Sequence, residues 1–127
     1  MKLRNLAQLL FFLMLFFLFA DKLNASGDGY LAFAEKMPEP VNGIAELYKL
    51  IEYPRVAQQA GVEGKVFLLC FIDESGTVND VKVVKGIGAG CDEAASDAVK
   101  KMKFTPGQNE SKPVKVKLTL SVVFKLK

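Results

Sequence analysis

The sequence contains no histidine, and only two of its 127 residues are cysteines. Histidine is the most frequent general base in enzymes and the most frequent metal ligand. Cys70 and Cys91 are too few for a disulfide scaffold and lack the spacing of zinc ligands. No pair of acidic residues and no nucleophile with a partner base can be assembled either. We therefore predict a protein that is not an enzyme and that has no catalytic residue, no metal and no cofactor.

A strong net charge is also missing. Lys2 and Arg4 are two of the 17 basic residues, so 15 remain beyond residue 20 against 14 acidic ones. Domains that bind nucleic acid carry a clear basic excess. The charge therefore predicts no nucleic-acid partner, and the length of the chain allows about one domain.

The N-terminus has the composition of an export signal. Lys2 and Arg4 precede an almost wholly apolar run over residues 6–20. About fifteen apolar residues after a positive start are typical of a secretory signal peptide, because a spanning helix needs roughly twenty. Cleavage would follow Ala20 or Ala25. The alternatives are an uncleaved inner-membrane anchor with its basic end in the cytoplasm and a buried core helix. We predict that residues 1–20 are a signal peptide or membrane anchor and that the rest reaches the periplasm.

Residues 21–42 are polar, with scattered apolar side chains and two closely spaced prolines, which predicts a tether. We expect one domain over residues 43–127. It begins with a short amphipathic helix over residues 43–52, whose apolar side chains recur at helical spacing as Ile44, Leu47, Tyr48 and Ile51. Pro54 ends this helix and can open a further turn over residues 55–60.

Residues 62–73 predict a strand that is apolar on both faces. One face carries Val66, Leu68, Cys70 and Ile72, and the other carries Phe67, Leu69 and Phe71. Such a strand belongs in the centre of a sheet. Turn residues at 73–76 join it to a second strand over residues 78–85, as an antiparallel hairpin.

A second helix follows, with one apolar stripe made of Cys91, Ala94, Ala95, Ala98, Val99 and Met102. Acidic residues at its start and lysines at its end match the helix dipole. Thr105-Pro106-Gly107 ends it. The last stretch, residues 113–127, alternates strictly between apolar and mostly polar residues, which predicts a long strand. Its polar side carries four lysines, a usual protection of an edge strand.

These elements predict an α+β fold with a small antiparallel-type sheet of three strands in the order 2-1-3 and a helix packed on one face. The final strand then lies at an edge, where an extended peptide can add by main-chain hydrogen bonds. We expect the helix of residues 43–52, or a partner, over the face that carries Phe67. Cys70 and Cys91 point into the layer between sheet and helix, as two buried thiols or as a disulfide if the backbone brings them close enough.

Several motifs carry a family resemblance over about residues 53–126: Tyr53-Pro54, Gly64-Lys65-Val66, Asp73-x-x-Gly76-x-Val78, Cys91-Asp92-Glu93-Ala94-Ala95, Phe104-x-Pro106-Gly107 and Val123-Phe124-Lys125-Leu126. In this order and spacing they resemble the C-terminal domain of the TonB family. The resemblance implies a periplasmic domain that contacts TonB-dependent outer-membrane transporters. In that family the edge of the final strand receives a short transporter peptide, the TonB box, and transmits force from inner-membrane motor proteins.

Carried over to this sequence, the resemblance implies a partner-binding strand that acts chiefly through backbone groups of Val114, Lys115, Val116, Lys117, Leu118, Thr119, Leu120, Ser121, Val122, Val123 and Phe124. The family's spanning helix has a histidine that couples to the motor, and this chain has none. Residues 21–36 also span at most about 55 Å when extended. The alternative function is therefore a self-associating structural or adaptor module without motor coupling. In it, Phe67, Leu69 and Phe71, together with the helix of residues 43–52, would form the seam of a homodimer.

Overall fold

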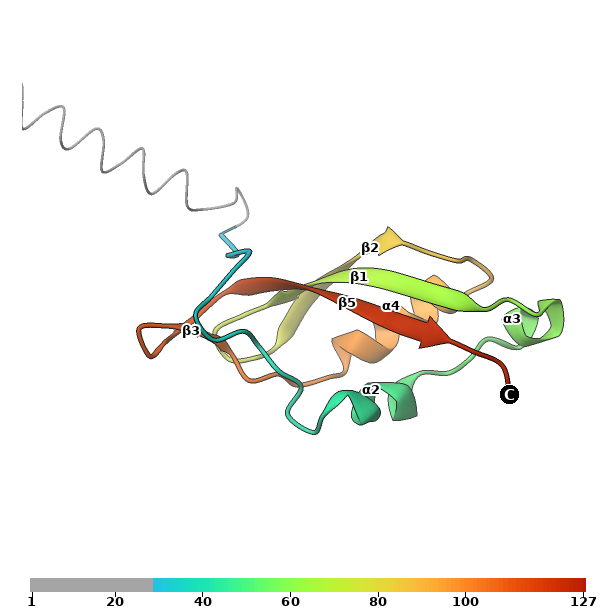
Figure 1. The fold of residues 1–127 in the computed structure, drawn as a ribbon, viewed down its shortest axis with the longest axis horizontal. Coiled ribbons are helices and arrows are strands. Elements are labelled where there is room, and N and C mark those ends of the chain that lie inside the picture. The colour runs from blue at the N-terminus through green and yellow to red at the C-terminus, as the bar shows by residue number, and fades with distance from the viewer. Residues whose placement is uncertain (1–28) are drawn as a thin grey trace, which may run out of the picture.

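The computed structural model describes residues 29–127 (Figure 1). Its main sheet contains β1 (Gly64–Ile72), β2 (Val78–Lys85) and β5 (Val116–Phe124) in the order β2-β1-β5, with both pairs antiparallel. This confirms the α+β class, the strand order and the edge position of the final strand. The predicted signal or anchor and the first part of the predicted tether lie outside the described residues.

The central strand β1 has the two apolar faces that its sequence predicts. Val66, Leu68, Cys70 and Ile72 are fully buried between the sheet and the helices. Its pairing with β5 runs without a break from Gly64 opposite Phe124 to Ile72 opposite Val116, whereas its pairing with β2 has two register shifts. The pair formed by β1 and β5 is therefore the regular one, and β5 is the regular edge of the sheet.

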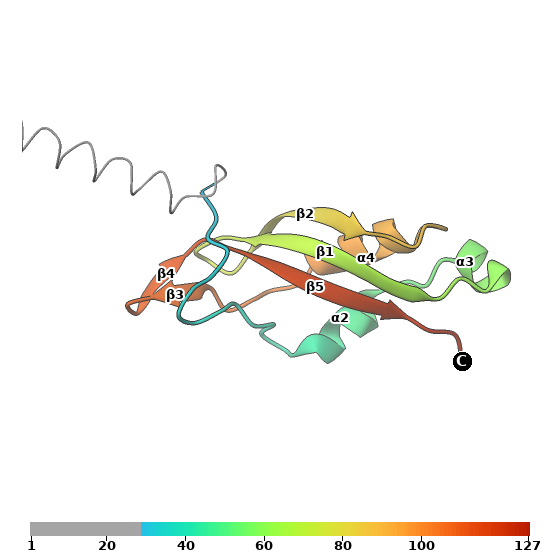
Figure 2. The same cartoon turned by 45° about the horizontal axis from the view of Figure 1, so that its top comes forward.

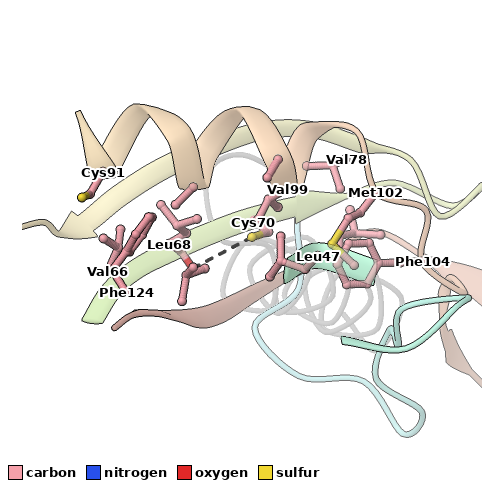
Figure 3. Close-up of a cluster of buried hydrophobic side chains, with 14 of the residues drawn as sticks. Leu47, Val66, Leu68, Cys70, Val78, Cys91, Val99, Met102, Phe104 and Phe124 are labelled. Atoms are coloured by element: carbon pink, nitrogen blue, oxygen red, sulfur yellow. Dashed lines mark hydrogen bonds between the residues drawn. The ribbon is translucent and has the colours of Figure 1, made fainter. Parts of the chain in front are cut away.

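Helix α4 (Cys91–Lys100) covers the buried face of β1 and β2, and its small alanines allow a close approach (Figure 3). Asp92 and Glu93 lie in its first turn and Lys100 in its last, as the helix dipole favours. The Asp92 carboxylate also accepts a hydrogen bond of 2.9 Å from the N–H of Ile87, which fixes the glycine-rich loop before the helix.

Helix α2 (Ile44–Leu50) is followed by the short helix α3 (Arg55–Ala60). The prediction that α2 covers the face of Phe67 was wrong. Its single buried side chain, Leu47, belongs to the same core as Cys70 and Val99, so α2 and α4 lie on the same side of the sheet (Figures 2 and 3). The physical reason is that α4 lies over β1 and β2, and the apolar side of β5 needs a cover of its own.

The opposite face of the sheet is only partly covered. Phe71 is buried, because the ring of Tyr30 packs edge-on against it at 5.1 Å between centroids and the Lys82 ammonium lies 5.3 Å from its centroid. Phe67 and Leu69 remain half-buried. Within residues 29–127, the cover on this face thus comes from the segment before α2 and not from a helix.

The predicted final strand was too long at both ends, because β5 begins at Val116 and ends at Phe124. Lys112–Val114 forms a separate strand, β4, which pairs with β3 (Gly107–Asn109) in a small second hairpin. Glu110 and Ser111 at its tip have φ values of 52° and 63°, the left-handed conformation of a two-residue hairpin turn. The alternation continues across the break because Val114 is half-buried and Val116 is buried.

The turn between β1 and β2 is built by one carboxylate and one glycine. Asp73 accepts hydrogen bonds from the N–H groups of Ser75 (2.9 Å) and Thr77 (3.0 Å) and from the Ser75 hydroxyl (2.6 Å). The bond from the Ser75 side chain is the main reason that the pKa of Asp73 lies below its usual value. Gly76, at φ 83°, accepts a bond of 3.0 Å from the N–H of Phe104 and ties the turn to the chain after α4.

Candidate functional site

The register of β5 determines which of its backbone groups point away from the sheet. The N–H of Lys117 donates to the carbonyl oxygen of Leu31, outside the main sheet, at 2.9 Å. In an antiparallel pair, residues alternate between those that bond to the neighbouring strand and those whose N–H and C=O point the other way. The backbone N–H and C=O groups of Thr119, Ser121 and Val123 therefore also point away from β1. In the described part of the chain, nothing bonds to the outward N–H of Thr119 or Ser121.

The side chains of β5 alternate between the two faces of the sheet. Val116, Val122 and Phe124 are buried, and Leu118 and Leu120, near the middle of the strand, are half-buried on the same core side. On the other side, Thr119, Ser121 and Val123 are exposed. A strand added at this edge would therefore place one row of its side chains next to Leu118 and Leu120 and the other row in solvent.

One end of this edge is occupied by the protein itself. The N–H of Leu31 donates to the carbonyl of Lys115 at 2.9 Å, and its carbonyl accepts the N–H of Lys117, so that Leu31 forms a parallel bridge to Val116. The cyan segment of Figure 1 passes beside the start of β5 at this point. No pattern in the sequence indicates this bridge, because a single paired residue has no periodicity.

The other end is limited by helix α2. The N–H of Val123 lies 3.3 Å from the hydroxyl oxygen of Tyr48, which accepts its hydrogen bond. Helical spacing grouped Tyr48 with Leu47 as a core residue, but Tyr48 is 44% exposed and Leu47 is 0% exposed. The only sequence signal that Tyr48 could bond to the β5 edge is its position towards the margin of the apolar stripe.

The predicted partner-binding residues thus fall into three groups. Val116, Leu118, Leu120, Val122 and Phe124 direct their backbone groups to β1. Val114 lies in β4, and Lys115, Lys117 and Val123 have outward groups bonded to Leu31 or Tyr48. Thr119 and Ser121 have outward N–H and C=O groups that bond to no residue in the range 29–127. Partner binding by these residues stays a prediction.

The two cysteines are separate thiols in the layer between sheet and helix. Both are fully buried and unpaired, and Figure 3 shows Cys91 at the start of α4 and Cys70 in the middle of the core. Burial raises the pKa of Cys70 to about 12. Burial, and secondarily the carboxylates of Asp92 and Glu93, raises the pKa of Cys91. Neither thiol has the low pKa of a reactive cysteine.

We expect both thiols to resist alkylation in the native protein at pH 8. Reaction requires local opening of the core followed by ionisation of a thiol with a raised pKa, so modification by iodoacetamide should be at least about 100-fold slower than in urea. Mass spectrometry over time measures both rates. Rapid labelling of Cys91 in the folded chain would show that the start of α4 opens easily.

Residues 29–127 contain no group of three or more acidic or cysteine side chains arranged to hold a metal ion. Within the same range, no helix is both long and apolar enough to cross a membrane.

The comparison with known protein families agrees with this architecture. Residues 49–126 match the family model of the Gram-negative bacterial TonB protein C-terminal domain, which covers more than half of the chain and all of the main sheet. The chain belongs to the TonB C-terminal family.

Curated TonB proteins are similar over the same region. The chain is 31% identical to Protein TonB of Vibrio cholerae over 75 residues, or 58% of this chain and 31% of that protein. It is 34% identical to Protein tonB2 of Pseudomonas aeruginosa over 76 residues, or 59% of this chain and 28% of that protein. The chain therefore spans about a third or less of the length of these TonB relatives.

Solved TonB domains have the same fold. The solution structure of the Pseudomonas aeruginosa TonB C-terminal domain superimposes with a TM-score of 0.51 at 31% identity, covering 61% of this chain and 79% of that one. The Helicobacter pylori TonB C-terminal domain gives a TM-score of 0.50 at 29% identity, covering 65% and 88%. The predicted fold and the predicted family are both confirmed.

Proposed function

We propose that this chain is a periplasmic TonB-like protein that binds an extended N-terminal peptide of an outer-membrane transporter by β-strand addition, as part of energy-dependent uptake across the outer membrane. One observation carries the proposal: on the edge strand of a TonB C-terminal fold, Thr119 and Ser121 point N–H and C=O groups outward to which no residue among 29–127 bonds. Strand addition uses such main-chain groups for affinity and alternate side-chain positions for specificity.

The β5 edge suits this role better than the opposite edge of the sheet. β5 pairs with β1 in an unbroken register, so its outward groups are evenly repeated. β2, the other edge strand, has two register shifts in its pairing with β1. Irregular edges of that kind hinder the addition of a further strand. The half-buried Leu118 and Leu120 also give the peptide an apolar side against which to pack.

Isothermal titration calorimetry of the full chain with synthetic peptides tests the proposal. The peptides should cover the mature N-termini of the TonB-dependent transporters of the same organism. The matched control is the same peptide N-methylated at alternate residues, which removes backbone donors and keeps the side chains. We expect one peptide to bind and its N-methylated form to lose binding. Equal binding of both forms, or no binding by any peptide, would contradict the proposal.

A second candidate function, self-association, rests on the half-buried Phe67 and Leu69 on the sheet face opposite α4. In that case two copies would bury these side chains against each other. Sedimentation equilibrium at micromolar concentration separates the two candidates. A stable dimer that is disrupted by Phe67→Ser would favour self-association, and a monomer would exclude this seam.

A further inference from the structure

The segment before α2 is bound to the domain along most of its length. We call residues 29–41 the N-terminal strap. Besides the Leu31 bridge to β5, Lys36 exchanges two backbone hydrogen bonds with Gln108, at 2.9 and 3.0 Å. Nearer its end, the carbonyl of Glu39 accepts the N–H of Thr105 at 2.8 Å, and Val41 donates to the carbonyl of Lys103 at 3.0 Å. The strap thus connects the β5 edge to the chain that follows α4.

At its start, the strap is held by Tyr30. The Tyr30 ring packs edge-on against Phe71, and its hydroxyl accepts a hydrogen bond of 3.0 Å from the side-chain amide of Asn79. The Lys115 ammonium lies 5.7 Å from the centroid of the same ring. These contacts come from β1, from β2 and from the residue before β5, and they fix the residue immediately before Leu31.

Between Leu31 and Lys36 the strap is held weakly. Ala32, Phe33 and Glu35 are exposed, and Phe33 is 84% exposed. The N–H of Glu35 bonds to the side chain of Asn109 at 2.8 Å, but no described residue bonds to the backbone of Phe33. Leu31 can therefore leave β5 without breaking the bonds between Lys36 and Gln108, if the contacts of Tyr30, which keep Phe71 buried, are released.

The hydrogen bonds made by Leu31 and by Tyr48 at the two ends of β5 define the length of the open edge. The N–H of Lys117 is taken by Leu31, and the N–H of Val123 is taken by Tyr48. At about 3.3 Å per residue, the positions between them accommodate an added strand of about five residues. A longer strand in register with β5 would need the place of Leu31 at one end or of Tyr48 at the other.

We propose that the N-terminal strap is a built-in competitor for the peptide site: Leu31 and Tyr48 restrict the β5 edge to a short extended peptide, and a longer peptide must displace Leu31. This inference rests on the proposed function, since it concerns the selectivity of the same edge. It makes Leu31 and Tyr48 specificity-determining residues, with Tyr30 as the residue that positions Leu31.

The experiment uses the full chain and two synthetic probes, a five-residue and a ten-residue peptide from one transporter N-terminus. Tyr30→Ala releases the strap without altering any backbone group of β5. Phe33→Ala is the matched control, because it removes an aromatic ring three residues away that is almost fully exposed. Tyr48→Phe removes only the hydroxyl that bonds to Val123. Thermal melting confirms that each variant is folded.

We expect Tyr30→Ala to raise the affinity for the ten-residue peptide about tenfold, the equivalent of losing a competing pair of hydrogen bonds. Its affinity for the five-residue peptide should not change, and Phe33→Ala should change neither. In the free protein, amide hydrogen exchange at Lys117 should be faster in Tyr30→Ala than in Phe33→Ala. Exchange at Val123 should be faster in Tyr48→Phe alone.

Two different failures can be told apart. If the ten-residue peptide binds wild type and Tyr30→Ala equally, or if the Leu31 bridge to β5 persists in the saturated complex, the competitor role is wrong and the proposed function stands. If neither peptide binds any variant although Lys117 exchanges faster in Tyr30→Ala, the strap covers the edge but the proposed function fails, and the competitor role fails with it.

Discussion

Thr119→Pro is expected to weaken peptide binding by the domain strongly while leaving its fold intact. Proline at this position removes an outward backbone donor and places its ring where the added strand would lie. The peptide would lose one hydrogen bond and keep an unpaired carbonyl, so affinity should fall on the order of 100-fold. The fold tolerates the change because this N–H does not bond to β1, and edge strands accept proline at such positions. Titration calorimetry measures the affinity.

Two further variants make this result interpretable. Thr119→Ala removes the side chain but keeps the N–H, and it should bind the peptide nearly as well as wild type. Leu118→Pro removes a donor that bonds to β1 opposite Cys70, and it should destabilise the domain strongly. Peptide binding that survives in a folded Thr119→Pro variant would show that the peptide site lies elsewhere.

Gly76→Ala should be the most damaging single substitution in the turn between β1 and β2. A Cβ at this position would lie 1.8 Å from the carbonyl oxygen of Phe104, and the backbone has φ +83°. The atom in the way belongs to the backbone, so the turn and the segment after α4 would have to separate. We expect a loss of at least about 3 kcal/mol, from left-handed strain and from the lost contact of Phe104. Urea unfolding followed by circular dichroism measures it.

Gly88→Ala is the matched control for Gly76→Ala. Gly88 has a similar φ of +75°, but an added Cβ would meet nothing within 4 Å. Only the backbone strain remains, so the cost should be about 1 kcal/mol. Similar losses in the two variants would show that the approach of Phe104 to Gly76 is not a source of stability.

Much of the fold could be predicted because its signals are local and repeated. The alternation from Val116 to Phe124 identifies β5, and the two apolar faces around Leu68 identify the central strand. Turn residues such as Asp73 and Gly76 make the pairing of β1 and β2 a simple inference, and one crossover rule then places β5 at the edge. Each of these elements has several residues that agree with one another.

The parts that could not be predicted depend on single contacts between distant segments. Leu31 meets β5 through two backbone bonds, which leave no pattern in side-chain chemistry. Tyr48 lies on the apolar stripe of a short helix, and only the position of α2 beside β5 exposes its hydroxyl to Val123. The extra hairpin β3–β4 turns at Glu110 and Ser111, which are not the residues that normally mark a left-handed turn.

The most direct test of the central claim is residue-specific amide hydrogen exchange of the full chain, free and saturated with a transporter peptide. Strand addition at the β5 edge predicts that the amides of Thr119 and Ser121 exchange rapidly in the free protein and become strongly protected in the complex. The outward amides of β2 should not change. Protection that appears along β2, or on the sheet face around Phe67, with Thr119 and Ser121 still exchanging rapidly, would contradict the account.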